Sequence, residues 1–183
     1  MKPCRLHIVG ASGSGTSTLG RAVAGAWSVP FHDSDDYFWQ PTEPPYTLRR
    51  EVAERLDLVA RMFLPRKAWV LSGSVMGWGE PFAASFDLVV FLQVDPAVRL
   101  ARLRQREASR IGAAAIAPGG ALHQSHVDFM AWAAGYDDPA FTGRSLRRHE
   151  AWLAALGVPV LRLDGDRPTG DLVAEIAAVL PGP

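Results

Sequence analysis

The sequence predicts an α/β fold in which a parallel β-sheet carries helices on both faces. Short apolar runs alternate with stretches whose apolar residues recur at helical spacing, which is the pattern of repeated strand–helix units. The run Leu88–Leu92 is apolar at every position, as a strand buried on both faces should be. A glycine-rich loop at residues 10–18 joins the first apolar run to the first helical stretch.

The first half of the chain supplies two strands and two helices. The first strand is expected at Leu6–Val9 and the first helix at Ser17–Trp27, where apolar residues recur every four positions. A second strand at Val29–His32 ends in a run of carboxylates. The aromatic and proline-rich stretch 37–46 argues against regular helix, and a long helix is expected from Thr47. Its expected buried face consists of Leu48, Val52, Leu56, Val59 and Phe63.

The second half adds the remaining strands of the sheet. Trp69–Ser72 ends at a glycine, and the apolar run described above leads to Asp95 and Pro96, which are expected to start a helix. Val158–Leu163 is the last expected strand, followed by a turn at 164–166 and a final helix. The inward face of that helix is expected at Leu172, Val173, Ile176 and Leu180.

Composition describes an ordinary globular domain. The chain has 183 residues, 48% hydrophobic and 21% charged, enough for one domain with its own core. Its net charge of +0 gives no support for a nucleic-acid polymer or an anionic membrane as partner. The single cysteine, Cys4, excludes an intramolecular disulfide, and we interpret it as a packing residue in a reducing compartment. With neither a leader segment nor a membrane-spanning run in view, we expect a cytoplasmic protein.

The loop at residues 10–18 has the spacing of a phosphate-binding loop with one departure. Such loops read Gly-x4-Gly-Lys-Ser/Thr, and Thr16 stands where the lysine belongs. Its glycines allow backbone N–H groups to turn inward around phosphate oxygens, at the positive end of the next helix. Ser17 fills the position whose hydroxyl ligates Mg²⁺. The expected nucleotide-binding residues are Gly10, Ala11, Ser12, Gly13, Ser14, Gly15, Thr16, Ser17 and Thr18.

The absence of the loop lysine leaves several alternatives for the function open. A hydrogen bond to a charged group contributes about 1.5–3 kcal/mol, roughly ten- to a hundredfold in affinity or rate. Backbone amides and Mg²⁺ remain, so phosphate binding is expected to survive, with arginines from elsewhere supplying the charge for transfer. One alternative is a module that binds nucleotide and turns it over poorly because of Thr16. Another is a loop that only joins a strand to a helix.

Two further polar clusters are expected at the same edge of the sheet. The run 33–36 and the pair Gly73–Ser74 both follow strands, and sites in parallel sheets lie at the carboxyl ends of the strands. Asp33 and Asp35 are two apart in an expected extended segment, so their side chains share a face. Asp33 is a candidate for the Mg²⁺ site, and Asp35 for binding the substrate or accepting its proton. For each carboxylate, a cap or an Asx turn is the alternative.

Arginines mark the helix after Asp95 and the segment that follows it. Residues 99, 102, 106 and 110 are arginines that stay within an arc of about 80° on a helix. The weakly periodic segment 111–143 comes next, closed by basic residues at 144, 147 and 148. We interpret it as a lid that closes over phosphates, with Arg102, Arg106 and Arg144 supplying positive charge during transfer. A solvated basic helix face is the alternative.

Three more residues are candidates for the substrate side. Arg49 and Arg50 are candidates for binding a substrate phosphate or carboxylate, with a solvated helix start as the alternative. Trp78 follows Gly73 and Ser74 closely enough to wall a substrate pocket, with a place in the core as an equal alternative. Gly73 and Ser74 themselves belong to the same expected substrate side.

These residues together resemble the small P-loop kinases of nucleoside monophosphates and of shikimate, over nearly the whole chain. Residues 15–20 are similar to the shikimate-kinase loop apart from Thr16, and 31–35 to its segment with one aspartate at Mg²⁺ and one at the substrate. Residues 94–106 are similar to the adenylate-kinase helix whose arginines contact transferring phosphates. Asp164 and the glycine after it resemble the turn near the adenine, which adds Asp164 to the nucleotide-binding candidates.

The resemblance implies a P-loop NTPase fold with five parallel strands in the order 2-3-1-4-5 and a helical lid insert. It implies one domain over 1–183, with its core at 1–107 and 145–183, a substrate-side insert at about 37–66 and a lid at about 108–144. The chain also resembles adenylate-kinase-like bacterial P-loop proteins, a resemblance that implies no particular substrate. We expect it to use ATP and Mg²⁺ and to phosphorylate a small molecule or a nucleoside monophosphate. Ser72-Gly73-Ser74 departs from the shikimate-kinase glycine triplet, and 37–46 shows no nucleotide-acceptor loop, so the acceptor stays open. The sequence does not indicate an oligomeric state.

Overall fold

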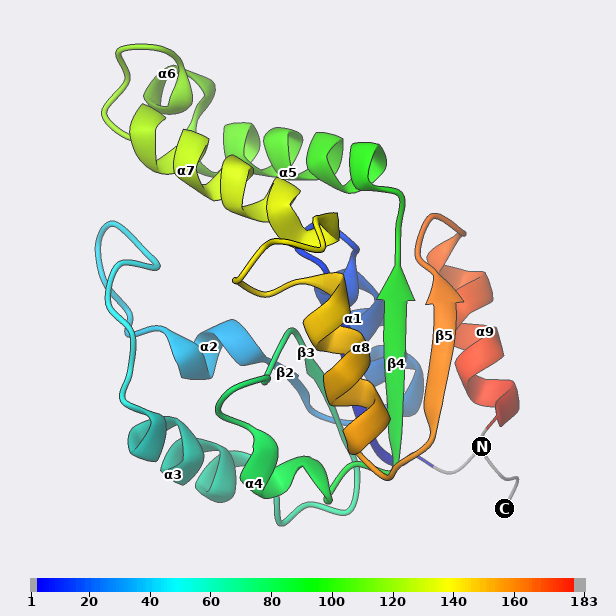
Figure 1. Ribbon diagram of the computed structural model, residues 1–183. Coiled ribbons are helices and arrows are strands. Elements are labelled where there is room, and N and C mark those ends of the chain that lie inside the picture. The colour runs from blue at the N-terminus through cyan, green and yellow to red at the C-terminus, as the bar shows by residue number, and fades with distance from the viewer. Residues whose placement is uncertain (1–2, 180–183) are drawn as a thin grey trace.

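A computed structural model describes residues 3–179 and contains a five-stranded parallel sheet in the order β2-β3-β1-β4-β5 (Figure 1). The fold class and strand order expected from the sequence are confirmed. The strands are β1 (Arg5–Gly10), β2 (Phe31–Asp33), β3 (Trp69–Ser72), β4 (Leu88–Gln93) and β5 (Val160–Asp164).

Helices cover both faces of the sheet and extend beyond one edge. They are α1 (Thr16–Trp27), α2 (Ser34–Phe38), α3 (Val52–Met62), α4 (Glu80–Ala83), α5 (Pro96–Ile111), α6 (Ala113–Ile116), α7 (His123–Ala134), the 3₁₀ turn η1 (Gly135–Asp137), α8 (Leu146–Ala155) and α9 (Thr169–Val179). Within residues 3–179, none of them combines the length and the apolar character needed to span a bilayer.

Two hydrophobic clusters sandwich the sheet. One packs α1 and α9 against one face, and the other packs α3, α4 and α8 against the opposite face. Strand β4 alternates between them, because Val90 belongs to the first cluster and Phe91 to the second. Each of these side chains is at most 1% exposed, as expected for a strand buried on both faces.

The carboxyl ends of the strands point toward α5, α6 and α7, which stand above the sheet in Figure 1. Helices α5 and α7 pack side by side, and the chain returns through η1 into α8. Asp95 caps α5 as expected, since its Oδ1 accepts hydrogen bonds from the N–H groups of Ala97 (2.8 Å) and Val98 (3.4 Å). The segment between β4 and α8 is therefore anchored next to the edge where the polar clusters gather.

Several expected boundaries are wrong for identifiable reasons. A short helix, α2, follows β2 directly and takes in part of the aromatic stretch, because Asp33 caps its start. Helix α3 begins at Val52 instead of Thr47; Leu48 is 50% exposed, and Val52 is 43% exposed, while Arg55 takes a buried position. Of the expected face of α9, Leu172 and Ile176 are buried, and Leu180 lies outside the described residues.

Candidate functional site

The glycine-rich loop connects β1 to α1 at the carboxyl edge of the sheet. Gly13 and Gly15 have left-handed φ angles of 84° and 94°. A Cβ on Gly13 would lie 2.4 Å from the main-chain oxygen of Arg99, so the loop packs directly on α5. Gly15 precedes α1, and among the described residues no side chain caps this helix start. Its first N–H groups are thus directed at the position where such loops bind phosphate.

A hydroxyl–carboxylate cluster lies beside this helix start. Asp33 Oδ2 accepts hydrogen bonds from Ser17 Oγ (2.5 Å) and from Ser72 Oγ (3.2 Å). Strand order explains the meeting: Asp33 and Ser72 end adjacent strands and are direct partners in the β2–β3 register, and Ser17 lies in the first turn of α1. The other oxygen, Asp33 Oδ1, accepts the N–H of Asp35 at 3.2 Å and caps α2. Asp33 therefore serves as a helix cap and also bonds to the loop serine.

The donor set at this cluster fits Mg²⁺. Magnesium prefers oxygen ligands and is usually held by one or two carboxylates together with water and substrate phosphates. Ser17 and Asp33 would hold the ion on the protein side, with the phosphates of a bound nucleotide as further ligands. No group of three or more His, Cys, Asp and Glu suited to a metal occurs within residues 3–179. A site built from one hydroxyl, one carboxylate and phosphate oxygens does not need such a group.

Asp35 lies two residues after Asp33, in the first turn of α2. Its pKa is raised, chiefly because surrounding protein removes water from the carboxyl group and secondarily because Asp33 carries like charge. Arg144 and Arg106 act in the opposite direction through their positive charge. These two arginines come from distant parts of the chain, so the fold brings three sequence-predicted residues to one region. A raised carboxyl pKa suits a group that accepts a proton.

Arg144 reaches into the phosphate loop from the segment that precedes α8. Its Nη2 donates a hydrogen bond to Ser12 Oγ at 2.7 Å, and its guanidinium lies 4.9 Å from the ring centroid of Trp132. Burial lowers the pKa of Arg144, and the nearby Asp35 carboxylate partly opposes this. Its Nε is buried without a hydrogen-bond partner, and within residues 3–179 no carboxylate oxygen lies within 4.0 Å of it. The site therefore contains a desolvated cation without a close counter-ion.

Arg102 and Asp164 lie on another side of the loop. Arg102 donates hydrogen bonds to Asp166 Oδ1 (2.7 Å) and to the main-chain oxygen of Gly165 (3.2 Å). It lines a hollow of about 210 Å³ together with Ser14, Gly15, Thr18, Leu19, Leu92, Gly165, Arg167, Thr169 and Leu172. Asp164 closes the adjacent turn by accepting the N–H of Asp166 at 2.9 Å. These residues adjoin the phosphate loop, and their hydrogen bonds within residues 3–179 do not involve Asp35.

The remaining predicted substrate residues are dispersed. Arg49 is exposed and lies 5.7 Å from the ring centroid of Trp39, while Arg50 pairs with Glu54 at 2.6 Å. Trp78 is only 3% exposed and belongs to the core cluster under α4, so the structure does not bring its ring to an open pocket. The core alternative describes its position, because the chain turns sharply after β3 at Gly73 (φ 91°) and returns the indole to the sheet.

Two buried contacts that sequence reasoning missed hold α7 and η1 against α5 and α8. Arg99, 0% exposed, donates a hydrogen bond to the main-chain oxygen of Ala133 (2.9 Å) and pairs with Asp137. The expected arginine face of α5 is therefore not uniform. Arg99 lies four residues before the buried Leu103, and this spacing is the local signal that Arg99 faces inward.

The second missed contact centres on His149 of α8, which is 0% exposed. Its Nδ1 lies 2.7 Å from the Tyr136 hydroxyl, and its Nε2 lies 3.2 Å from Ser74 Oγ. Burial lowers the pKa of His149 to about 3, with the Arg144 charge as the next cause. No local sequence pattern predicts this contact, because Ser74 and His149 are 75 residues apart in sequence. Ser74 is thereby linked through His149 to Tyr136 in η1.

Comparison with known proteins yields one curated relative and many similar folds. No protein-family model matches the chain. The uncharacterized protein YqaC of Bacillus subtilis (strain 168) is 39% identical over 171 residues, covering 93% of this chain and 94% of the relative.

Among solved structures, the chain is similar to shikimate kinase from Bacteroides thetaiotaomicron (TM-score 0.58, 17% identity, 96% of this chain and 97% of that chain). It is also similar to shikimate kinase from Acinetobacter baumannii in complex with shikimate (TM-score 0.56, 17% identity, 97% and 93%). A gluconokinase from Sinorhizobium meliloti 1021 gives a TM-score of 0.53 with 21% identity, covering 96% and 90%. The fold is thus that of the small P-loop kinases, as the sequence resemblance implied.

Proposed function

The chain belongs to the family of the Bacillus subtilis protein YqaC, and we propose that it is an ATP-dependent, Mg²⁺-assisted phosphotransferase of the cytoplasm. Its acceptor would be a small molecule or a nucleoside monophosphate. The observation that carries the proposal is the bond between Ser17 Oγ and Asp33 Oδ2 (2.5 Å) at the start of α1. It joins the hydroxyl of a phosphate-binding loop to a carboxylate at the end of β2, and these two oxygens are donors that would hold Mg²⁺ beside a bound nucleotide.

Each residue of the site has a role in this reaction. Loop N–H groups and the start of α1 would bind the β-phosphate, and bound Mg²⁺ would neutralise charge on the transferring group. Asp35 would orient or deprotonate the acceptor hydroxyl, because its raised pKa makes it a better base than an ordinary aspartate. Arg144 and Arg106 would stabilise the charge that develops in transfer.

The similar solved structures favour a small-molecule acceptor. Shikimate kinases and a gluconokinase are kinases by name, and the shikimate kinase from Acinetobacter baumannii was solved in complex with shikimate. In this chain the Arg144 charge acts on the Asp35 carboxyl, and a carboxylate together with a guanidinium is suited to an acceptor with both hydroxyl and anionic groups. Arg49, Arg50 and Ser74 remain candidates for further contacts on this side, and we assign Trp78 to the core instead.

Release of ADP with a panel of acceptors tests the proposal. Hydroxy acids, polyols, sugars and nucleoside monophosphates would each be mixed with ATP, Mg²⁺ and the full chain. We expect one class to raise ADP release above the acceptor-free background, and Asp35→Asn to abolish that rise while the exposed neighbour variant Asp36→Asn retains it. If ATP binds and no acceptor in the panel raises ADP release, the transferase proposal fails.

Thr16 favours a second candidate, a nucleotide-binding module with weak or no turnover. This candidate predicts that ATP with Mg²⁺ raises the melting temperature, since a ligand that binds only the folded state stabilises it. It also predicts ADP release at background level with every acceptor. The same two measurements therefore separate the two candidates.

A further inference from the structure

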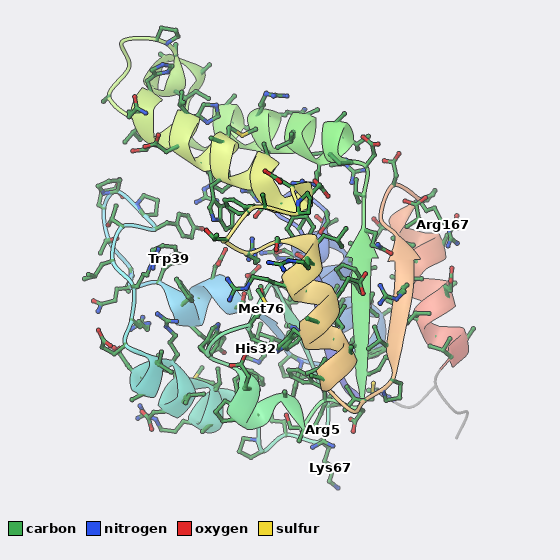
Figure 2. All side chains as sticks on the ribbon, viewed as in Figure 1. Arg5, His32, Trp39, Lys67, Met76 and Arg167 are labelled. Atoms are coloured by element: carbon green, nitrogen blue, oxygen red, sulfur yellow. The ribbon has the colours of Figure 1, made fainter. Side chains whose placement is uncertain are left out.

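The phosphate loop has no cation of its own. Residues 10–18 contain neither lysine, arginine nor histidine. Lys67 is the only lysine within residues 3–179, and Figure 2 shows it at the opposite edge of the sheet, near Arg5 at the start of β1. Within the described residues, the cation that contacts the loop is an arginine that another element brings to it.

Three arginines contact the loop or line the hollow beside it, and they differ in their partners. Arg167 is paired with Glu175 at 2.5 Å. Arg102 is already paired with Asp166 at 2.7 Å and is directed to the turn after β5. Arg144 donates to Ser12 Oγ at 2.7 Å, in the first half of the loop, and within residues 3–179 no carboxylate oxygen lies within 4.0 Å of it. Removing a cation from water is costly unless an anion or hydrogen bonds compensate for it. Arg144 is therefore the group that a bound phosphate would satisfy.

The surroundings of Arg144 hold the guanidinium in place. The ring of Trp132 in α7 lies 4.9 Å from its central carbon, and its buried Nε has no hydrogen-bond partner. Arginine can bind phosphate with two parallel N–H groups, so a guanidinium with a free, buried N–H is suited to that ligand. A solvated surface arginine would not be stacked, desolvated and bonded to the loop at once.

We propose that Arg144 replaces the missing loop lysine as the cation that binds the terminal phosphates of ATP. The proposal rests on the proposed nucleotide binding and goes further, because Arg144 belongs to the segment between the lid and α8 and not to the loop. Two contacts fix this segment: the buried pair of Arg99 with Asp137 and the hydrogen bond between Tyr136 and His149. These contacts then also position Arg144, the residue that binds the nucleotide. Nucleotide affinity is thereby coupled to the placement of the lid.

A rescue experiment tests the replacement directly. Isothermal titration calorimetry would measure ATP affinity with Mg²⁺ for the full chain and for Arg144→Ala, Thr16→Lys and the double variant. We expect Arg144→Ala to weaken ATP binding by roughly ten- to a hundredfold, the value of a hydrogen bond to a charged group. Thr16→Lys should recover at least half of that loss on the logarithmic scale in the Arg144→Ala background, and should change affinity by less than about threefold in the wild-type chain.

Matched controls separate a phosphate contact from a structural one. Arg147→Ala removes an exposed arginine three residues away and should leave ATP affinity unchanged. Binding of adenosine, which carries no phosphate, should be equal in wild type and Arg144→Ala. If Arg144→Ala unfolds without ligand, Arg144→Gln provides the same test, since it keeps a hydrogen-bond donor and loses the charge.

The outcomes distinguish this inference from the proposed function. A wild-type chain that binds no ATP at all overturns both. ATP binding that is unchanged in the Arg144 variants, or a loss that Thr16→Lys does not recover, overturns the replacement and leaves the transferase proposal standing. An equal loss of adenosine and ATP binding also overturns it, because the arginine would then support the fold and not the phosphates.

Discussion

Replacing Gly13 by alanine perturbs the contact between the phosphate loop and α5. Gly13 has a φ of 84°, and an added Cβ would lie 2.4 Å from the main-chain oxygen of Arg99 and 2.9 Å from Leu103 Cγ. Neither the backbone oxygen nor the buried leucine can move aside at small cost. Gly13→Ala should therefore strain the loop and displace it from the helix.

Two terms set the size of the effect. An L-residue in the left-handed region costs about 1–2 kcal/mol. Forcing an extra carbon into a packed contact costs about 1–3 kcal/mol. The free energy of unfolding should thus fall by about 2–5 kcal/mol, which corresponds to roughly 4–20 °C in melting temperature for a domain of this size. Displaced loop amides should also weaken ATP binding by tenfold or more.

Gly25→Ala is the matched control, because Gly25 lies in α1 with no atom within 4 Å of an added Cβ. Alanine there should stabilise the helix by about 0.5–1 kcal/mol. Urea unfolding and calorimetric ATP titration of both variants check the pair. If Gly13→Ala is as stable as Gly25→Ala and binds ATP equally well, the loop is not packed on α5 and the argument is refuted.

Three other variants test separate parts of the molecule. Burial lowers the pKa of His7 to about 4, so the unfolded chain binds a proton between pH 6.5 and 4 that the folded chain does not. Stability should therefore fall with acidification, by about 2 kcal/mol from this group between pH 7.5 and 5, and His7→Phe should flatten the pH dependence of urea unfolding; an unchanged slope would contradict this. Asp35→Asn should lower turnover with the identified acceptor by about 10²–10⁴-fold while ATP affinity in calorimetry changes less than about threefold; equal losses in both would place Asp35 at the nucleotide instead. Trp78→Ala should lower the free energy of unfolding, measured in urea, by about 3–5 kcal/mol. A loss below about 1 kcal/mol would contradict the core position and support the alternative that the indole lines an open pocket.

The parts of the site that follow strands directly could be predicted from the sequence. Asp33 and Ser72 each end a strand, and parallel pairing brings such positions to one edge of the sheet. Ser17 lies in the first turn of the helix that follows the glycine-rich loop at the same edge. The cap at Asp95 was equally local, because the N–H groups that donate to its side chain lie two and three residues away. Periodicity and turn chemistry contain this information, so the positions of the glycine-rich loop and of Asp33 could be predicted without knowledge of tertiary contacts.

The groups that come from helices above the sheet could not be predicted in this way. A helical residue reaches the site or the core according to how the helix is tilted and rotated, and periodicity does not fix either. Arg99 and Arg102 illustrate this, since residues three apart on α5 enter a buried pair and an exposed turn contact respectively. The prediction that the long helix starts at Thr47 was wrong for a related reason. Residues 39 and 49 form an isolated antiparallel bridge, which holds this stretch out of the helix that its apolar spacing suggested.

The same distinction explains why Thr16 left the function open. Judged from the loop alone, threonine in place of the usual lysine at residue 16 removes a positive charge, and the backbone amides are the groups left to bind phosphate. A phosphate site needs positive charge near the terminal oxygens, but that charge can come from any element that packs against the loop. Arg144 is 132 residues from Ser12, so no spacing rule connects them, and only the folded chain places one beside the other. A loop without its lysine is therefore evidence about where the cation is attached, and it becomes evidence for an inactive site only when no buried arginine or lysine faces the loop.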